Sequence, residues 1–110
     1  MSLIQGVKEL QAKAPWTSLW SSAYKEDPRE YKDFEHCLVS IVAKAGELLS
    51  MCEKVDHYGD HKEFNLTTIK RNLGFIVMSA LKAANKNPTR EPVDVSEFIE
   101  HDYARRGVTL

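Results

Sequence analysis

The chain has almost none of the features that mark a membrane-spanning, secreted or disordered protein. No apolar run approaches the roughly 20 residues that a membrane-spanning helix needs. The amphipathic segment 1–13 has no uninterrupted apolar core, so it does not predict a signal peptide. A hydrophobic fraction of 43% is enough to form a core, which argues against disorder. We therefore expect a globular, cytoplasmic protein with no membrane partner.

Neither sign of charge is in excess, because 15 basic residues face 16 acidic ones. A chain this close to neutrality has no strong long-range attraction for nucleic acid, which is therefore not an expected partner. The basic residues between positions 70 and 90 form no continuous stripe and are interpreted as facing solvent. They are Lys70, Arg71, Lys82, Lys86 and Arg90.

Cysteine is scarce, and its spacing excludes one use of it. Cys37 and Cys52 fall 15 residues apart on one predicted helix, hence about 22 Å apart at 1.5 Å per residue. A disulfide needs Cα atoms within about 7 Å, so the two cannot pair with each other. Both lie on or beside an apolar stripe, and we predict two buried free thiols.

Several catalytic signatures are also missing. The sequence contains no glycine-rich phosphate loop, no paired-cysteine zinc pattern, no nucleophile elbow and no dinucleotide fingerprint. No segment has the pattern of a β-strand, and there is no internal repeat. A length of 110 residues fits one domain, residues 1–110. The expected fold class is all-α.

Two long segments carry apolar residues at alternating steps of three and four, which predicts helices that pack lengthwise on a partner. The first segment begins at the cap Asp27–Pro28 and ends at Gly59. Its stripe comprises Tyr31, Phe34, Leu38, Ile41, Ala45, Leu48, Cys52 and Val55. The second segment begins at the cap Asn65 and is stopped by Pro88. Its stripe comprises Leu66, Ile69, Leu73, Ile76, Ala80 and Ala83.

The linker between these helices, segment 58–64, is short enough to fold them into an antiparallel hairpin. Small residues are expected to let the two backbones approach closely, namely Ala45, Gly46, Gly74 and Ala80. A short helix from Leu3 to Ala14 precedes the hairpin. Another follows, capped by Asp94 or Ser96 and ending before Gly107. The predicted architecture is a small helical bundle with a long hairpin and short N- and C-terminal helices.

Metal-ligand types gather around the hairpin turn, at Glu53, Asp56, His57, Asp60, His61 and Glu63. Glu53 and His57 are four residues apart and could share a helix face, but Gly59 is predicted to break the helix before His61. A solvated helix end explains the same residues. No metal site is predicted, and Glu53, His57 and His61 remain the candidates if there is one.

Two strings in the hairpin resemble the MazG-type nucleoside triphosphate pyrophosphohydrolases, an all-helical family. The strings are A-K-A-G-E-L, residues 43–48, and I-K-R-N-L-G-F-I, residues 69–76. In that family a Glu-x-x-Glu step is followed, after a turn, by Glu-x-x-Asp. Segment 95–106 is similar to the family's closing helix, so the resemblance covers Phe34 to Arg106.

The acidic residues of the family are mostly replaced here. The first pair aligns with Lys44 and Glu47 and the second with Asn72 and Phe75, so only Glu47 keeps a carboxylate. In the family these acids hold magnesium, which requires hard oxygen ligands. The resemblance therefore implies a pseudoenzyme without a cofactor, a homodimer that binds a nucleotide or a protein partner. Lys44, Glu47 and Asn72 are its candidate ligand-binding residues, although Lys44 and Glu47 also suit an ordinary helix surface.

Three other functions remain open. One is an active magnesium-dependent pyrophosphohydrolase with a rearranged site at Glu47, Glu53 and Asp56. Another is a structural or assembly protein, because two copies of the long hairpin could form a four-helix bundle. The third follows from a looser similarity to short phage proteins that sequester cyclic nucleotide signals.

Overall fold

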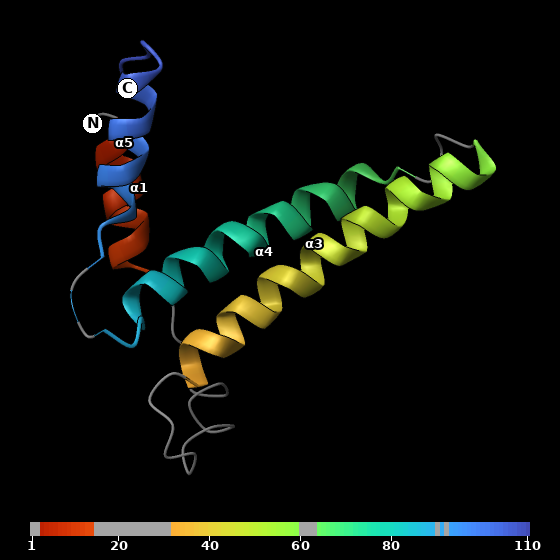
Figure 1. Cartoon of the computed structure of the whole chain (residues 1–110), viewed down its shortest axis with the longest axis horizontal. Helices are drawn as coiled ribbons and strands as arrows, with labels where there is room; N and C mark the ends of the chain where they lie inside the picture. Colours follow the sequence, from red (N-terminus) through yellow and green to blue (C-terminus); the bar gives the residue numbers. More distant parts are fainter. Residues whose placement is uncertain (1–2, 15–31, 60–63, 90, 92) are drawn as a thin grey trace.

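The computed structural model describes residues 3–14, 32–59, 64–89, 91 and 93–110. Within them it contains the helices α1 (Leu3–Ala12), α3 (Lys32–Tyr58), α4 (Leu66–Asn85) and α5 (Val95–Arg105), and no strand. The all-α prediction is confirmed. The long helices α3 and α4 form an antiparallel hairpin, while α1 and α5 lie together beyond the end of α4 (Figure 1).

The turn of the hairpin follows its predicted chemistry. Gly59 adopts a φ of +65°, a conformation that costs glycine little, and its amide donates to the carbonyl oxygen of Val55 at 2.7 Å. Asn65 caps α4, because its side chain accepts a 3.0 Å hydrogen bond from the amide of Thr68. The predicted cap of the first long helix, Asp27–Pro28, lies outside the described residues.

The ends of the short helices are also set by local signals. Asp94, rather than Ser96, is the cap of α5, and its Oδ1 accepts from the Ser96 amide at 3.0 Å. Gly107 follows α5 with a φ of +82°, as expected for a residue that ends a helix. The first helix ends at Ala12, two residues before the predicted end at Ala14.

The seam between α3 and α4 differs from the predicted stripe. On α4 the buried residues along it are Asn72, Ser79 and Ala83, whereas Leu66 and Leu73 are 80% and 50% exposed. The predicted stripes placed Leu38 of α3 and Leu66, Leu73 and Ala80 of α4 in the seam, which is wrong because all four are exposed. The apolar stripe of α4 is wider than one partner helix can cover, so α3 buries only one edge of it.

Two further expectations about the hairpin are corrected. A Cβ atom added at Gly46 or Gly74 would meet no atom within 4 Å, so neither glycine permits a close approach of the backbones. Both cysteines are free, but only Cys37 is buried and Cys52 is exposed. Cys52 lies beside the seam rather than in it, which explains why the prediction of two buried thiols is wrong for Cys52.

Candidate functional site

The hairpin brings the four positions of the family resemblance together. Asn72 is completely buried, and its Nδ2 donates to Oε2 of Glu47 at 2.6 Å and to the carbonyl oxygen of Lys44 at 3.2 Å. The register of the antiparallel helices therefore sets the aligned pairs opposite each other. We call Lys44, Glu47, Asn72 and Phe75 the hairpin cluster.

The two charged members of this cluster, Lys44 and Glu47, lie within ion-pair distance of each other. The Lys44 Nζ lies 3.7 Å from Oε1 of Glu47 and 5.4 Å from the centre of the Phe75 ring. An ammonium group above an aromatic ring is attracted by the negative face of the ring. Lys44 is thus held between a carboxylate and an aromatic ring, with 32% of its side chain exposed.

The carboxyl group of Glu47 is stabilised in its ionised form. Its pKa is lowered by the hydrogen bond from Asn72 first, and then by the positive charges of Lys44 and Arg71. Each of these interactions favours the anion, and they outweigh the opposing effect of desolvation. Glu47 is therefore suited to pairing with cations or donors, and poorly suited to act as a general acid.

Asn72 has one unused hydrogen-bonding atom. Its Oδ1 is buried and, in the described part of the chain, accepts no hydrogen bond. A buried acceptor without a partner costs about 1–3 kcal/mol. This cost makes Asn72 an unusual residue for the seam of a helical hairpin.

The hairpin cluster does not fit the magnesium ion of the resembled family. Magnesium takes hard oxygen ligands, usually carboxylates and water. The cluster offers one carboxylate, on Glu47, and the ammonium of Lys44 lies 3.7 Å from it. The groups of the hairpin cluster therefore do not suit a divalent cation, and we propose no metal-dependent reaction there.

The other metal-ligand candidates are not assembled into a site by the described residues. His57 Nε2 lies 3.7 Å from Oε1 of Glu53, and both side chains are about two-thirds exposed. No group of three His, Cys, Asp or Glu residues that could hold a metal occurs in the parts of the chain described. His61 lies outside those parts.

A pocket that the sequence analysis did not identify lies where α1 meets the end of α4 and the segment before α5. We call it the junction pocket; its volume is about 470 Å³. Polar and charged side chains from all three parts line it, among them Lys8, Gln11, Asn85, Glu91 and Asp94. Their sequence separation of up to 86 residues is why pattern analysis could not group them.

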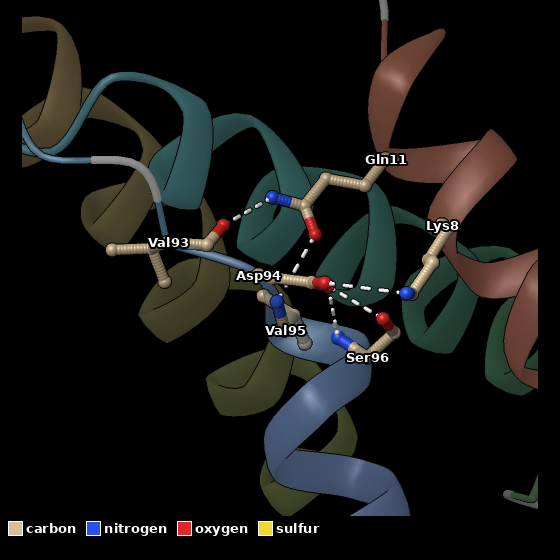
Figure 2. A network of polar contacts seen from close by, with 6 residues as sticks. All are labelled: Lys8, Gln11, Val93, Asp94, Val95 and Ser96. Carbon is tan, nitrogen blue, oxygen red and sulfur yellow. Dashed lines mark hydrogen bonds and ion pairs between the residues drawn. The ribbon is translucent and has the colours of Figure 1, made fainter.

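Gln11 holds the walls of the junction pocket together (Figure 2). It is 8% exposed, and its Nε2 donates to Val93 O at 2.7 Å and to Asn85 Oδ1 at 3.1 Å. Its Oε1 accepts from the amide of Val95 at 3.2 Å. One side chain of α1 therefore fixes both the end of α4 and the start of α5. No sequence signal marked Gln11, because a lone glutamine is usually a surface residue.

The second feature missed is an exposed apolar face on the hairpin. It consists of Leu38, Val42 and Leu49 of α3 with Leu66, Leu73 and Val77 of α4, all at least 42% exposed. Cys37 of α3 and Asn72 of α4 are buried in the seam. At 3.6 residues per turn, the three residues of each set lie about 100–140° around the helix axis from that seam residue, in the same rotational direction on both helices. Because the helices are antiparallel and face each other, both rotations lead to the same side of the hairpin. We call this side the apolar face.

Comparison with known proteins does not assign the chain to a family. No family model matches it, and no curated protein or solved structure is significantly similar to it. No helix in the described residues is long and apolar enough to cross a membrane. A functional assignment therefore depends on the hairpin cluster, the junction pocket and the apolar face.

Proposed function

We propose that this protein is a non-catalytic, MazG-like helical module that acts by binding a protein partner, and that its first partner is a second copy of itself. The apolar face carries this proposal. Large contiguous apolar surfaces are uncommon on monomeric proteins and mark sites of association. Within the apolar face, Leu66, Val42 and Leu49 are 80%, 70% and 68% exposed.

The geometry of the apolar face favours a partner made of two antiparallel helices. In a four-helix bundle each helix packs on two neighbours, in directions about 90° apart. The seam between α3 and α4 provides the first direction, and the apolar face is about 100–140° away from it around each helix. A second copy supplies a hairpin with a matching apolar face, which a two-fold axis would place against the first.

The loss of ligand chemistry supports the non-catalytic half of the proposal. Three of the four positions that align with acidic ligands hold Lys44, Asn72 and Phe75. The remaining carboxylate, on Glu47, accepts a hydrogen bond from Asn72 and pairs with Lys44. A metal at Glu47 would have to compete with both interactions and with the positive charge of Lys44.

Light scattering coupled to size-exclusion chromatography tests self-association directly. The wild-type protein should have twice the 12.5 kDa mass of the chain. The variant Leu49→Lys places a charge in the apolar face and should be monomeric. Val39→Lys is the control on the same helix, because Val39 is 56% exposed and lies about 200° around α3 from Cys37, outside the 100–140° that the apolar face spans.

Three results would contradict the proposal. A wild-type protein that stays monomeric at all accessible concentrations would exclude self-association through the apolar face. Equal masses for Leu49→Lys and Val39→Lys would place any dimer contact elsewhere. Nucleoside triphosphate cleavage that requires Glu47 would instead support the alternative of an active enzyme.

Nucleotide binding is a second candidate, favoured by one observation. Phe75 is 43% exposed, and the Lys44 ammonium lies 5.4 Å from its ring centre. An exposed aromatic ring beside a cation can stack on a base and contact a phosphate. A metal-independent rise in melting temperature with a nucleotide, absent in Phe75→Ala, would support it. No shift with any nucleotide would leave the protein partner as the function.

A further inference from the structure

The walls of the junction pocket are fixed before any ligand arrives. Gln11 links α1 to Asn85, Val93 and Val95 through its side chain, and the Asn85 Nδ2 donates back to the Gln11 carbonyl oxygen at 2.9 Å. Such a closed set of hydrogen bonds holds side chains in one arrangement, which lowers the entropic cost of binding. The junction pocket is therefore preorganised.

The uncharged polar groups of the junction pocket are already used by the protein. Asn85 is engaged by Gln11, and the Asn87 Nδ2 donates to the carbonyl oxygens of Ala84 and Glu91 at 3.0 and 2.9 Å. The other polar residues that line the junction pocket are charged, namely Lys8, Asp94 and Glu91. Charge, rather than amide hydrogen bonding, must therefore set the ligand class.

The charges are one ammonium and two carboxylates. The Lys8 Nζ lies 3.8 Å from Oδ2 of Asp94, a distance at the outer limit of an ion pair, and 45% of the Lys8 side chain is exposed (Figure 2). Asp94 Oδ1 accepts from the amide of Ser96, so its Oδ2 is the atom directed at Lys8. A loose, half-exposed pair of this kind can exchange its partners for those of a ligand at little cost.

From these observations we infer that the junction pocket binds a free α-amino acid with an apolar side chain. The ligand carboxylate pairs with Lys8, and the ligand ammonium pairs with Asp94 and Glu91. The wall formed by Ala12, Ala84 and Val93 contacts the apolar side chain. A nucleotide or a sugar phosphate is disfavoured, because the two carboxylates repel added negative charge.

Nuclear magnetic resonance of the ¹⁵N-labelled full chain tests this inference with L-leucine as the probe. We expect L-leucine to shift the amide signals of Lys8, Gln11 and Asp94. Leucinamide lacks the carboxylate and N-acetyl-leucine lacks the ammonium, so each should bind at least about tenfold more weakly. Lys8→Met and Glu91→Gln should each weaken L-leucine binding by a similar factor, about tenfold.

Lys13→Met is the matched control, because Lys13 is an exposed lysine just after α1 that does not line the junction pocket. Its binding of L-leucine should equal that of the wild type. Several outcomes overturn the inference: no shift with L-leucine, equal binding of leucinamide and L-leucine, or unchanged binding in both pocket variants. If the diamine putrescine bound more tightly than L-leucine, the ligand class would be a dication rather than a zwitterion, and the inference would also be overturned.

Discussion

Asn72 and Glu47 face each other across the α3–α4 hairpin, joined by a 2.6 Å hydrogen bond from Asn72 Nδ2 to Glu47 Oε2. Asn72 is completely buried, while the Glu47 side chain is half exposed. The pair therefore links the interior of the seam to its solvent-facing edge. A buried polar residue at one seam position is a known means of fixing the register of packed helices, at a cost in stability.

The first prediction concerns the charge tolerated at position 72. Asn72→Asp would bury a second carboxyl group beside Glu47, and both burial and repulsion raise its pKa in the folded state. We expect a loss of about 3 kcal/mol in the free energy of unfolding at neutral pH. Because the folded state then binds the extra proton more tightly than the unfolded state, this loss should shrink as the pH falls. Urea unfolding across a pH series measures both effects.

The control is Asn72→Leu, which keeps the branched shape of the side chain and has no polar atom. It removes the unpaired Oδ1 and should leave stability unchanged or raise it by about 1 kcal/mol, with no added pH dependence. If Asn72→Asp were as stable as the wild type at neutral pH, position 72 would be more hydrated than its burial indicates.

A second prediction follows from the lowered pKa of Glu47. Asn72, Lys44 and Arg71 depress this pKa in the folded state. The ionised group therefore contributes stability above its unfolded pKa, and the contribution is lost as the pH falls through the folded pKa. Glu47→Gln keeps an oxygen acceptor for Asn72 but cannot ionise, so its stability should vary less with pH on the acid side. Circular dichroism during urea unfolding would detect the difference from the wild type.

Glu53→Gln provides the comparison for this effect, because Glu53 lies on the same helix and its side chain is 71% exposed. A larger change in Glu47→Gln than in Glu53→Gln would belong to the contacts of Glu47 with Asn72, Lys44 and Arg71. Identical profiles for Glu47→Gln and the wild type would show that the Asn72 hydrogen bond does not distinguish the ionised carboxyl from the neutral one.

The sequence was sufficient for the helices because their signals are local. The caps and the terminating glycines act on neighbouring backbone groups. The structure confirms Asn65, Gly59 and Gly107, and of the two caps predicted for α5 it shows Asp94. Local signals do not decide which residues of α4 face the seam. The stripe of α4 contained more apolar residues than one helix can cover, and only tertiary packing decides that Asn72 is buried while Leu73 is exposed.

Of the two candidate sites, one could be predicted from the sequence and the other could not. The resemblance aligned Lys44, Glu47, Asn72 and Phe75, and the hairpin register does place them in contact. The junction pocket could not be found from sequence, because Gln11 has no neighbouring motif and meets residues more than 70 positions away. Whether either site binds a ligand stays a prediction.

A third prediction separates the two thiols. Cys37 is 1% exposed, and burial raises its pKa despite the opposing charge of Lys82. Cys52 is exposed. In dilute native protein, a thiol reagent such as DTNB should modify one cysteine rapidly and the other only as the hairpin opens. Cys52→Ser should remove the fast phase and Cys37→Ser the slow one, so equal rates for both thiols would contradict the burial of Cys37.

The last prediction concerns Gln11, whose side chain joins three parts of the chain. Gln11→Ala removes its bonds to Asn85, Val93 and Val95, and leaves those partners without an acceptor or donor. We expect a loss of about 2 kcal/mol in the free energy of unfolding. Lys13→Ala, an exposed substitution just beyond α1, should change stability by less than about 0.5 kcal/mol.

Hydrogen exchange locates the effect of Gln11→Ala. Faster exchange should be confined to α1 and α5, because α3 and α4 have their own seam and do not depend on this side chain. Gln11→Glu gives an independent check, since it keeps the shape of the side chain but replaces the Nε2 donor with a carboxylate oxygen facing the oxygens of Val93 and Asn85. It should release α1 and α5 as Gln11→Ala does. Uniform acceleration in all four described helices would instead mean that the junction and the hairpin unfold as one unit.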